Sequence, residues 1–346
     1  MLLLAATPPA RLPLPTPQSA QTSAQTSAQT RPAQGRAVPA PGRVYANPVG
    51  PGADPTIVWA KGQYHYSCTT GRNVMVWSAP TLAGIKDAKP QVVFAPPAGT
   101  PYSEHLWAPE FFRWKGRAYI HFAADDGKDE NHRMYALRSR SDDPRGPYDF
   151  LGEVRTPENQ WSIDGFAFSH RGGLYFFWSG WQSTQNRDQR IYVARMKDPA
   201  TIVGPRVELS RPEFEWERRG WPVNEGPALL AKGRAVSMTY SGAGGSTPHY
   251  ALGRLFNPTG DLMNPRAWRK EPSPIFSAGA GMWAPGHNSF FTARDARPYI
   301  AFHAKRENKD GWGGRISAVQ PVSFDRSGRV QLGTPLGWDR MLAEPR

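Results

Sequence analysis

The same pattern of apolar and polar positions recurs five times after residue 46. Each copy begins with a polar or charged residue, continues as an apolar run, turns through a short polar or glycine-containing segment, and ends in a second apolar or aromatic run. Short apolar runs bounded by such turns predict antiparallel β-hairpins. The predicted hairpins cover residues 54–66, 110–122, 164–177, 225–238 and 287–299.

A further predicted strand follows each hairpin, so the repeating unit is longer than two strands. The first residues of successive copies are separated by 56, 54, 61 and 62 residues. A period of roughly 50–60 residues built from short strands is typical of a β-propeller, whereas a β-sandwich does not show one turn pattern at near-constant spacing. The sequence therefore predicts an all-β fold, a single five-bladed β-propeller over residues 44–346. The further strands are predicted at residues 74–78, 134–138, 191–195, 250–255 and 315–319.

Four carboxylates and one imidazole begin the five copies. The first strand of each propeller blade lines the central axis, so residues at equivalent places in the five strands converge. Crowded carboxylates repel one another and raise the pKa of at least one of them, which gives no structural reason to gather them. We therefore expect a functional pocket at this end of the axis. Its candidate residues are Asp54, Glu110, Asp164, Glu225 and His287.

Composition agrees with a sheet protein and excludes several other classes. The 346 residues include 13 Trp, 12 Tyr, 16 Phe, 34 Gly and 35 Pro, which favours short strands and tight turns over helical bundles. No apolar run reaches the roughly 20 residues that a membrane-spanning helix needs. The single cysteine, Cys68, excludes an internal disulfide and a cysteine-based zinc site, and its alternating strand predicts a buried structural thiol.

Residues 1–43 differ in composition from the rest of the chain. Residues 1–6 resemble the end of the apolar core of a signal peptide, although the stretch is short and lacks a charged start. The following residues are rich in Pro, Ala, Gln, Thr and Ser and repeat Gln-Thr-Ser-Ala, which predicts a disordered linker. We expect a secreted or periplasmic protein whose signal peptide is truncated or mis-started.

The net charge of +13 is shared unequally between the two parts of the chain. Residues 1–53 carry four arginines and no acid, which leaves +9 on the remainder. Such an excess suggests a nucleic-acid partner. However, the basic residues are scattered, and zinc-finger, phosphate-loop and RNA-binding signatures are absent. An acidic polysaccharide explains the same excess.

Carboxylates gathered in one pocket suit the cleavage of glycosidic bonds. One protonated carboxyl donates a proton to the leaving oxygen, while an ionised one activates water or attacks the sugar. The aromatic excess fits this chemistry, because sugar rings pack their C–H faces on aromatic side chains. The candidate platforms are Trp107, Trp161, Trp178, Trp181, Trp221 and Trp283.

Five segments in combination resemble glycoside hydrolase family 43, with the likeness covering about residues 44–340. That family comprises five-bladed propellers that act on arabinans and xylans by inversion. The segments are Asn-Pro-Val-Gly-Pro-Gly-Ala-Asp-Pro at 47–55, Leu-Trp-Ala-Pro-Glu at 106–110, Ser-Ile-Asp-Gly at 162–165, Val-Asn-Glu-Gly-Pro at 223–227 and Ala-Pro-Gly-His-Asn-Ser-Phe at 284–290.

The resemblance implies a role for each carboxylate. Asp54 is implied as general base, Glu225 as general acid, and Asp164 as the residue that orients the acid and tunes its pKa. No cofactor is implied for the chemistry, and His287 is placed at an axial site for structural calcium or water. We expect the remaining substrate contacts from Trp107, Glu110, Trp178, Trp283 and Arg315.

Shorter stretches are similar to the α-L-arabinofuranosidase branch of the family, at residues 124–127, 131–135, 178–181 and 204–207. The resemblance then implies exo-acting release of terminal arabinofuranose from arabinan, arabinoxylan or their oligosaccharides. A β-xylosidase, an endo-arabinanase and a non-catalytic sugar-binding propeller are the alternatives. A retaining, fructan-cleaving propeller fits less well, because Ala53 precedes Asp54 where those proteins carry Asn.

Two features bear on the partners. The glycine-rich residues 240–249 depart from the family pattern, which affects the leaving-group subsites rather than the reaction. The charge of +9 on the predicted propeller indicates attraction to pectin, the polyanion that carries arabinan side chains. Neither a nucleic-acid nor a membrane partner is expected.

Overall fold

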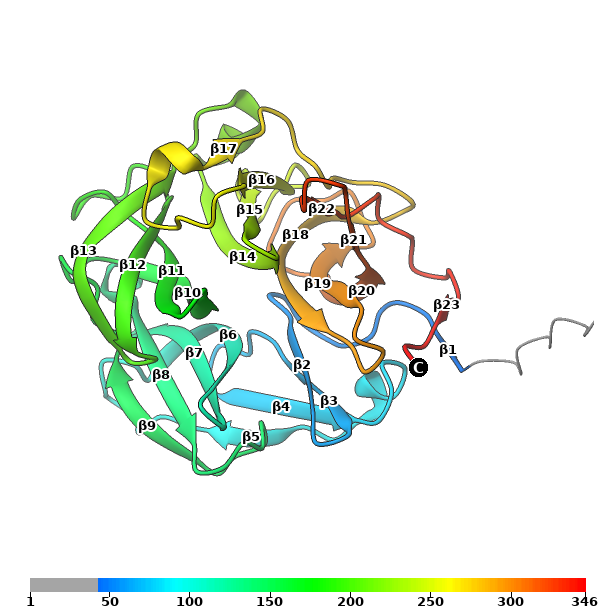
Figure 1. Cartoon of the computed structure of the whole chain (residues 1–346). Coiled ribbons are helices and arrows are strands. Elements are labelled where there is room, and N and C mark those ends of the chain that lie inside the picture. The colour runs from blue at the N-terminus through cyan, green and yellow to red at the C-terminus, as the bar shows by residue number, and fades with distance from the viewer. Residues whose placement is uncertain (1–42) are drawn as a thin grey trace, which may run out of the picture. The chain divides into compact units, whose positions relative to one another are not determined.

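Five antiparallel sheets surround a common axis in the computed structural model, which describes residues 43–346 (Figure 1). The predicted all-β, five-bladed propeller is confirmed. The predicted signal remnant and linker lie outside the described residues, except for Arg43. Within the described part of the chain, no helix is long and apolar enough to cross a membrane.

Each of the first four blades is a four-stranded meander whose strands follow one another in sequence. Blade one contains β2 (Thr56–Ala60), β3 (Gln63–Ser67), β4 (Val74–Ala79) and β5 (Gln91–Phe94). Blade two contains β6 (Glu104–Trp114), β7 (Arg117–Asp125), β8 (Arg133–Ser139) and β9 (Tyr148–Glu153). Blade three contains β10 (Ser162–His170), β11 (Gly173–Gly180), β12 (Arg190–Asp198) and β13 (Thr201–Ser210). Blade four contains β14 (Asn224–Lys232), β15 (Ala235–Gly242), β16 (Ala251–Asn257) and β17 (Arg269–Lys270).

Blade five is a three-stranded sheet. It contains β18 (Trp283–Thr292), β19 (Pro298–Lys305) and β20 (Arg315–Pro321). Two small sheets accompany it, formed by β1 (Val44–Tyr45) with β23 (Leu342–Ala343) and by β21 (Ser323–Phe324) with β22 (Val330–Gln331). The described residues also form four short 3-10 helices, η1 (Ile85–Asp87), η2 (Asp129–Asn131), η3 (Glu215–Arg218) and η4 (Pro265–Ala267).

The start of the described chain closes the ring against blade five. Backbone hydrogen bonds join Val49 and Gly50 to Ser317 of β20. The Asn47 side chain donates to the Val319 carbonyl at 3.2 Å and accepts from its N–H at 2.8 Å. Residues 47–50 therefore take the place of a fourth strand, which holds the two ends of the propeller together.

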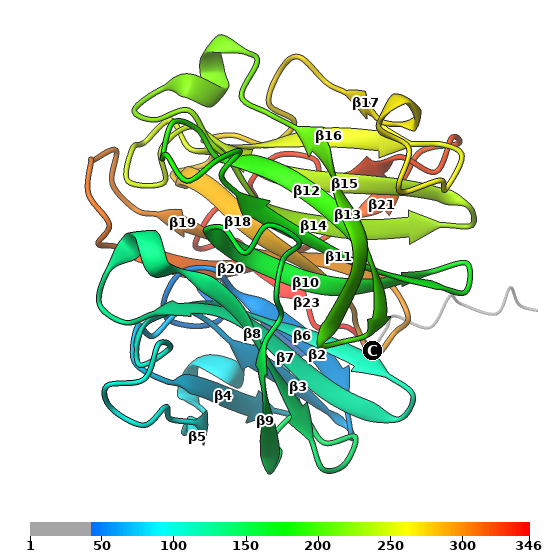
Figure 2. The same cartoon turned by 90° about the vertical axis from the view of Figure 1, so that its left-hand side faces the viewer.

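Figure 2 shows the blades from the side, and the core of buried side chains lies between neighbouring blades. The second strands β7, β11, β15 and β19 are buried along almost their whole length, because each is covered on both faces. The predicted buried thiol is confirmed, since Cys68 is 3% exposed and burial raises its pKa to about 12. The five predicted third strands are confirmed as β4, β8, β12, β16 and β20.

Candidate active site

All five blades contribute to one pocket of about 690 Å³ at one end of the axis. Blade three supplies Trp161, Asp164, Asn186 and Gln189, among others, and blade four supplies Trp221 and Glu225 together with a glycine-rich wall. The other blades complete the lining with Asp54, Thr69, Trp107, Asp129, His287, Trp312 and Arg315. The structure thus gathers the three predicted catalytic carboxylates in one place, together with Trp107, His287 and Arg315.

A single backbone feature recurs at the pocket end of every blade. At this place the backbone of each blade has a residue with positive φ, namely Asp54 (57°), Ala108 (42°), Asp164 (55°), Gly226 (54°) and His287 (39°). In blades two to five the register of the first hairpin breaks at this point. A β-bulge of this kind bends the strand and re-aims its side chains. Left-handed backbone at non-glycine residues is strained and clusters at functional sites.

Because of the bulges, the residues that begin the five sequence repeats do not all occupy equivalent positions in the structure. Ala108 and Gly226, rather than Glu110 and Glu225, occupy the positions that match Asp54. Glu225 precedes its bulge by one residue and still lines the pocket. Glu110 follows its bulge by two residues and lines a separate cavity of about 190 Å³ among the five first strands. Desolvation raises the pKa of the Glu110 carboxyl well above its usual range.

Two further predicted substrate contacts lie elsewhere. Trp178 is 1% exposed and packs in the core between blades, so its predicted contact with substrate is wrong. Its strand, β11, is covered on both faces, and an aromatic ring there faces core whichever way it points. Trp283 is half-buried at the start of β18, where it pairs with Lys305. Neither residue, nor Glu110, contributes to the pocket lining.

Asp54 is surrounded by positively polarised groups. Its Oδ2 accepts a hydrogen bond from Thr69 Oγ1 at 2.6 Å. Its Oδ1 lies 3.3 Å from both His287 Nδ1 and His303 Nδ1, and 3.7 Å from Arg315 Nη1. Burial alone would raise the pKa of Asp54, but the two histidines and Arg315 outweigh it and hold the pKa well below its usual range. Asp54 is therefore the ionised carboxylate of the pocket.

The pKa values of Asp164 and Glu225 are raised, whereas that of Asp54 is lowered. Burial, reinforced by the charge of Asp54, raises the pKa of Asp164 to about 8. Burial, reinforced by Asp164, raises the pKa of Glu225 to about 7. Asp164 Oδ2 accepts from the Gly226 N–H at 2.9 Å, which places it beside the strand that carries the acid. The pair retains a proton near neutral pH, so one pocket holds both a base and an acid.

His287 lies between the carboxylates, with its Nδ1 3.9 Å from Asp164 Oδ2 as well as near Asp54. Calcium takes six to eight oxygen ligands. Beside this ring, Asp54 Oδ2 accepts a hydrogen bond from Thr69 Oγ1, and Asp164 Oδ2 accepts one from the Gly226 N–H. Among the described residues, His287 belongs to no group of three His, Cys, Asp or Glu side chains close enough to share an ion, so the side chains around it do not form the calcium site that the resemblance implies.

Only one group of three His, Cys, Asp or Glu side chains in residues 43–346 lies close enough to share a metal. It consists of Asp125, Asp129 and His132, at the side of the pocket. Both oxygens of Asp125 already accept hydrogen bonds, from His105 Nδ1 at 3.0 Å and from the Gly127 N–H at 2.8 Å. The His132 ring stacks on the Trp107 ring with centroids 4.1 Å apart, and this is the contact through which His132 affects the pocket.

Four tryptophans line the pocket at two depths. Trp107 is fixed by His132, and Trp161 stacks on Trp181 with centroids 4.8 Å apart and planes 8° apart. Trp221 and Trp312 are 43% and 64% exposed, so they form the rim. Arg315 lies over the Trp312 ring at 5.1 Å while also facing Asp54. The predicted places of Trp107 and Arg315 in the pocket agree with this arrangement.

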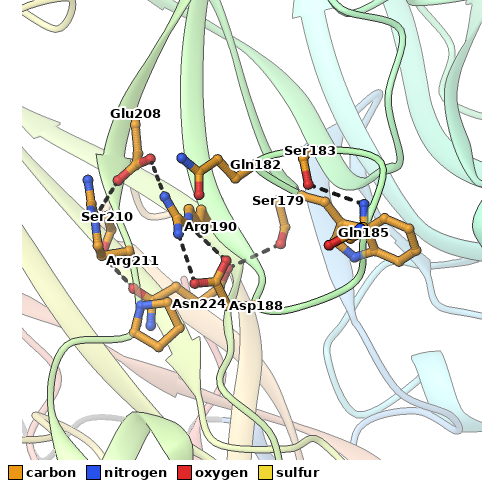
Figure 3. Close-up of polar contacts among 12 residues, drawn as sticks. Ser179, Gln182, Ser183, Gln185, Asp188, Arg190, Glu208, Ser210, Arg211 and Asn224 are labelled. Carbon is orange, nitrogen blue, oxygen red and sulfur yellow. Dashed lines mark hydrogen bonds and ion pairs between the residues drawn. The ribbon is translucent and has the colours of Figure 1, made fainter.

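A charged network fixes the loop that carries Asn186 and Gln189 into the pocket (Figure 3). Arg190 Nε donates to Asp188 at 2.8 Å and Arg190 Nη1 donates to Glu208 at 3.0 Å, which joins the loop to β13. Beside it, Ser210 Oγ donates to Asn224 Oδ1 at 2.6 Å. The residue after Asn224 is Glu225, so the same region also anchors the strand bearing the predicted acid.

The glycine-rich segment that departs from the family pattern forms one wall of the pocket. A Cβ at Gly245 would lie 3.1 Å from the Trp312 ring and 3.5 Å from Glu225 Oε1. The buried Lys305 fixes this wall, because its Nζ donates to the carbonyls of Ser246 at 3.0 Å and Lys309 at 3.2 Å. Glycine therefore leaves room for Trp312 immediately beside Glu225.

Three polar residues of the site are not predicted as site residues from the sequence. Thr69 follows the second strand of blade one, and its Oγ1 links Asp54 to the Ala108 N–H. Tyr250 donates to Glu225 Oε1 at 2.6 Å. His303, from which the sequence indicates only packing or hydrogen bonding at the rim, accepts the Asp54 N–H at 3.2 Å. Each is a polar residue beside or within an apolar strand, which is the one signal that could have identified it.

Comparison with known proteins identifies the family. The profile of Glycosyl hydrolases family 43 matches residues 45–330. An extracellular exo-α-(1→5)-L-arabinofuranosidase of Streptomyces chartreusis is 33% identical over 289 residues, which are 81% of this chain and 87% of that protein. A protein of the same name from Streptomyces avermitilis is 31% identical over 88% of this chain and 66% of its own length.

A solved structure supports the same assignment. The α-L-arabinofuranosidase from Lactobacillus brevis superimposes with a TM-score of 0.80 at 28% identity, covering 86% of this chain and 98% of that one. The family profile covers most of the chain, and one relative shares a third of its residues over nearly its whole length. The chain therefore belongs to glycosyl hydrolases family 43 and is a glycosidase.

Proposed function

We propose that this glycosidase is an inverting, exo-acting enzyme that releases terminal α-L-arabinofuranose from arabinan, arabinoxylan or their oligosaccharides. The observation that carries the proposal is that the pKa values of two carboxyls in one pocket are shifted in opposite directions. Asp54 is held ionised, while burial keeps a proton on the pair that includes Glu225. The two Streptomyces relatives, named as exo-acting arabinofuranosidases, support the choice of sugar.

Each carboxyl then has one task. Asp54 accepts a proton from a water molecule as the water oxygen bonds to the anomeric carbon. Glu225 gives its proton to the glycosidic oxygen as the bond from that oxygen to the anomeric carbon breaks. When Glu225 holds the proton of its pair, Asp164 is the ionised neighbour that keeps it there. Inversion requires the base and acid carboxyls to be about 6.5–9.5 Å apart, with room for the water between them.

Residues from all five blades line the active site, so it is a pocket rather than an open groove. A pocket suits the end of a polysaccharide chain, which supports exo action. The test compares an aryl α-L-arabinofuranoside, an aryl β-xyloside and linear arabinan. The proposal expects rapid hydrolysis of the arabinofuranoside and release of free arabinose from arabinan. Preference for the xyloside would indicate a β-xylosidase, early release of oligosaccharides would indicate an endo-arabinanase, and binding without turnover would indicate a sugar-binding propeller.

The pKa shifts predict a pH profile that extends unusually far into acid. Glu225 must be protonated, so kcat/KM on an arabino-oligosaccharide should fall as pH rises through about 7. Asp54 must be ionised, and its pKa lies below the ordinary 3.8, so the acid limb should lie below that value. Asp164→Asn removes the neighbouring carboxyl that helps to raise the pKa of Glu225, and should move the alkaline limb to lower pH. An alkaline limb that stays in place in this variant would contradict the assignment.

We also propose that the enzyme acts outside the cytoplasm and is drawn to pectin. Both Streptomyces relatives are named extracellular, and the chain beyond residue 53 carries +9. Added salt screens such attraction, since the Debye length falls from about 10 Å at 0.1 M to 3 Å at 1 M. We expect salt to lower kcat/KM on pectin-linked arabinan but not on neutral oligosaccharides. Parallel salt curves for the two substrates would exclude the attraction.

A further inference from the structure

Tyr250 is built tightly into the wall behind Glu225. Its hydroxyl donates to Glu225 Oε1 at 2.6 Å, and its side chain is 2% exposed. One edge of the ring lies over Gly286, where an added Cβ would come within 2.2 Å of the ring carbons. Only glycine at this position lets the ring take its place, so Gly286 and Tyr250 form a matched pair.

The face of the same ring connects it to the base. Tyr250 stacks on His303 with planes 2° apart and centroids 5.6 Å apart. His303 Nδ1 in turn accepts the Asp54 N–H at 3.2 Å. One rigid ring pair therefore touches the acid through a hydroxyl and the base through an imidazole, which fixes both carboxyls against a common support.

We infer that Tyr250 is a positioning residue for proton donation, which holds Glu225 Oε1 so that the second carboxyl oxygen faces the leaving group. The inference rests on the proposed role of Glu225 as general acid. In that role Glu225 changes from a neutral acid to a carboxylate as the glycosidic bond breaks. A hydrogen bond to a charged oxygen is stronger than one to a neutral oxygen, so Tyr250 favours the transition state over the bound ground state.

The hydroxyl is suited to this task at every working pH. Burial and the neighbouring Glu225 raise the pKa of Tyr250 well above its usual range, so it remains a donor. Its hydrogen bond lowers the pKa of Glu225 against the stronger effects of burial and of Asp164. Removing the hydroxyl should therefore raise the pKa of Glu225 and shift the alkaline limb of the pH profile to higher pH.

Tyr250→Phe tests the inference, because it keeps the ring against His303 and Gly286 and removes only the hydroxyl. We expect kcat on an arabino-oligosaccharide to fall by about 10- to 100-fold, the effect of losing one hydrogen bond to a charged group. KM should change little. On a dinitrophenyl arabinofuranoside, whose leaving group departs without a proton, kcat should stay close to wild type. The alkaline limb on the oligosaccharide should move upward.

Tyr148→Phe is the matched control. The Tyr148 hydroxyl also donates a hydrogen bond, to the Pro144 carbonyl at 2.8 Å, but Tyr148 lies in blade two and outside the pocket lining. This variant should keep wild-type kcat on both substrates, with any loss confined to thermal stability. Thermal melting of both variants confirms that each is folded before kinetics are compared.

The outcomes separate this inference from the proposed function. Equal losses on both substrates in Tyr250→Phe, or no loss on either, would overturn the positioning role. If Glu225→Gln shows the dependence on leaving group while Tyr250→Phe does not, only the inference about Tyr250 fails. If Glu225→Gln itself lacks that dependence, the assignment of the acid fails and the role of Tyr250 fails with it.

Discussion

Glu225→Gln is expected to lower kcat on arabino-oligosaccharides by about 10²- to 10⁴-fold, the range for loss of a general acid. The amide preserves the size of the side chain but cannot protonate the leaving oxygen. A dinitrophenyl arabinofuranoside needs no such proton, so its turnover should fall far less. Steady-state kinetics on the two substrates measure the difference directly.

Glu110→Gln provides a control with the same substitution. Glu110 lines the second cavity and not the pocket, and an amide is close to isosteric with its carboxyl group. Its kinetics should match those of the wild type on both substrates. Wild-type turnover in Glu225→Gln, or an equal loss on the two substrates, would contradict the assignment of Glu225.

Asp54→Asn is expected to lower kcat by about 10²- to 10⁴-fold on both substrates alike. Water must be activated whatever the leaving group, so a good leaving group cannot compensate for a missing base. Asparagine tolerates the positive φ of 57° at this position, so the variant should fold. The same two-substrate kinetics, together with thermal melting, check this expectation.

The pattern of losses is what separates base from acid. Asp325→Asn, at an exposed turn of the small β21–β22 hairpin, should leave kcat unchanged and serves as control. If the loss in Asp54→Asn were confined to the oligosaccharide, Asp54 would be acting on the leaving group rather than on water. Retained turnover on both substrates would remove it from the mechanism altogether.

The fold could be predicted because the patterns that specify its strands involve residues close together in the sequence. Alternation within each hairpin and the recurring turn are properties of neighbouring residues, and they specify the first three strands of each blade closely, but not the outer strands β5, β9, β13 and β17. The bulges are different, because a backbone irregularity at Ala108 or Gly226 leaves no apolar pattern. The repeat consequently matched Glu110 to Asp54, although the bulge carries Glu110 into another cavity.

The site was predictable only where a side chain has few alternative uses. A carboxylate beside an apolar strand has little structural reason to be there, and Asp54, Asp164 and Glu225 all line the pocket. A tryptophan serves equally well as core, and Trp178 is core. Tyr250 lies 25 residues from the acid it contacts, and nothing in its neighbours along the chain indicates that partner.

The stereochemistry of the product tests the central claim most directly. An ionised base and a protonated acid on opposite sides of the bond let water displace the leaving group in one step, which inverts the anomeric carbon. Proton NMR during hydrolysis of an aryl α-L-arabinofuranoside reports the first-formed anomer before mutarotation. The account predicts β-arabinofuranose first, and the appearance of α-arabinofuranose first would contradict it.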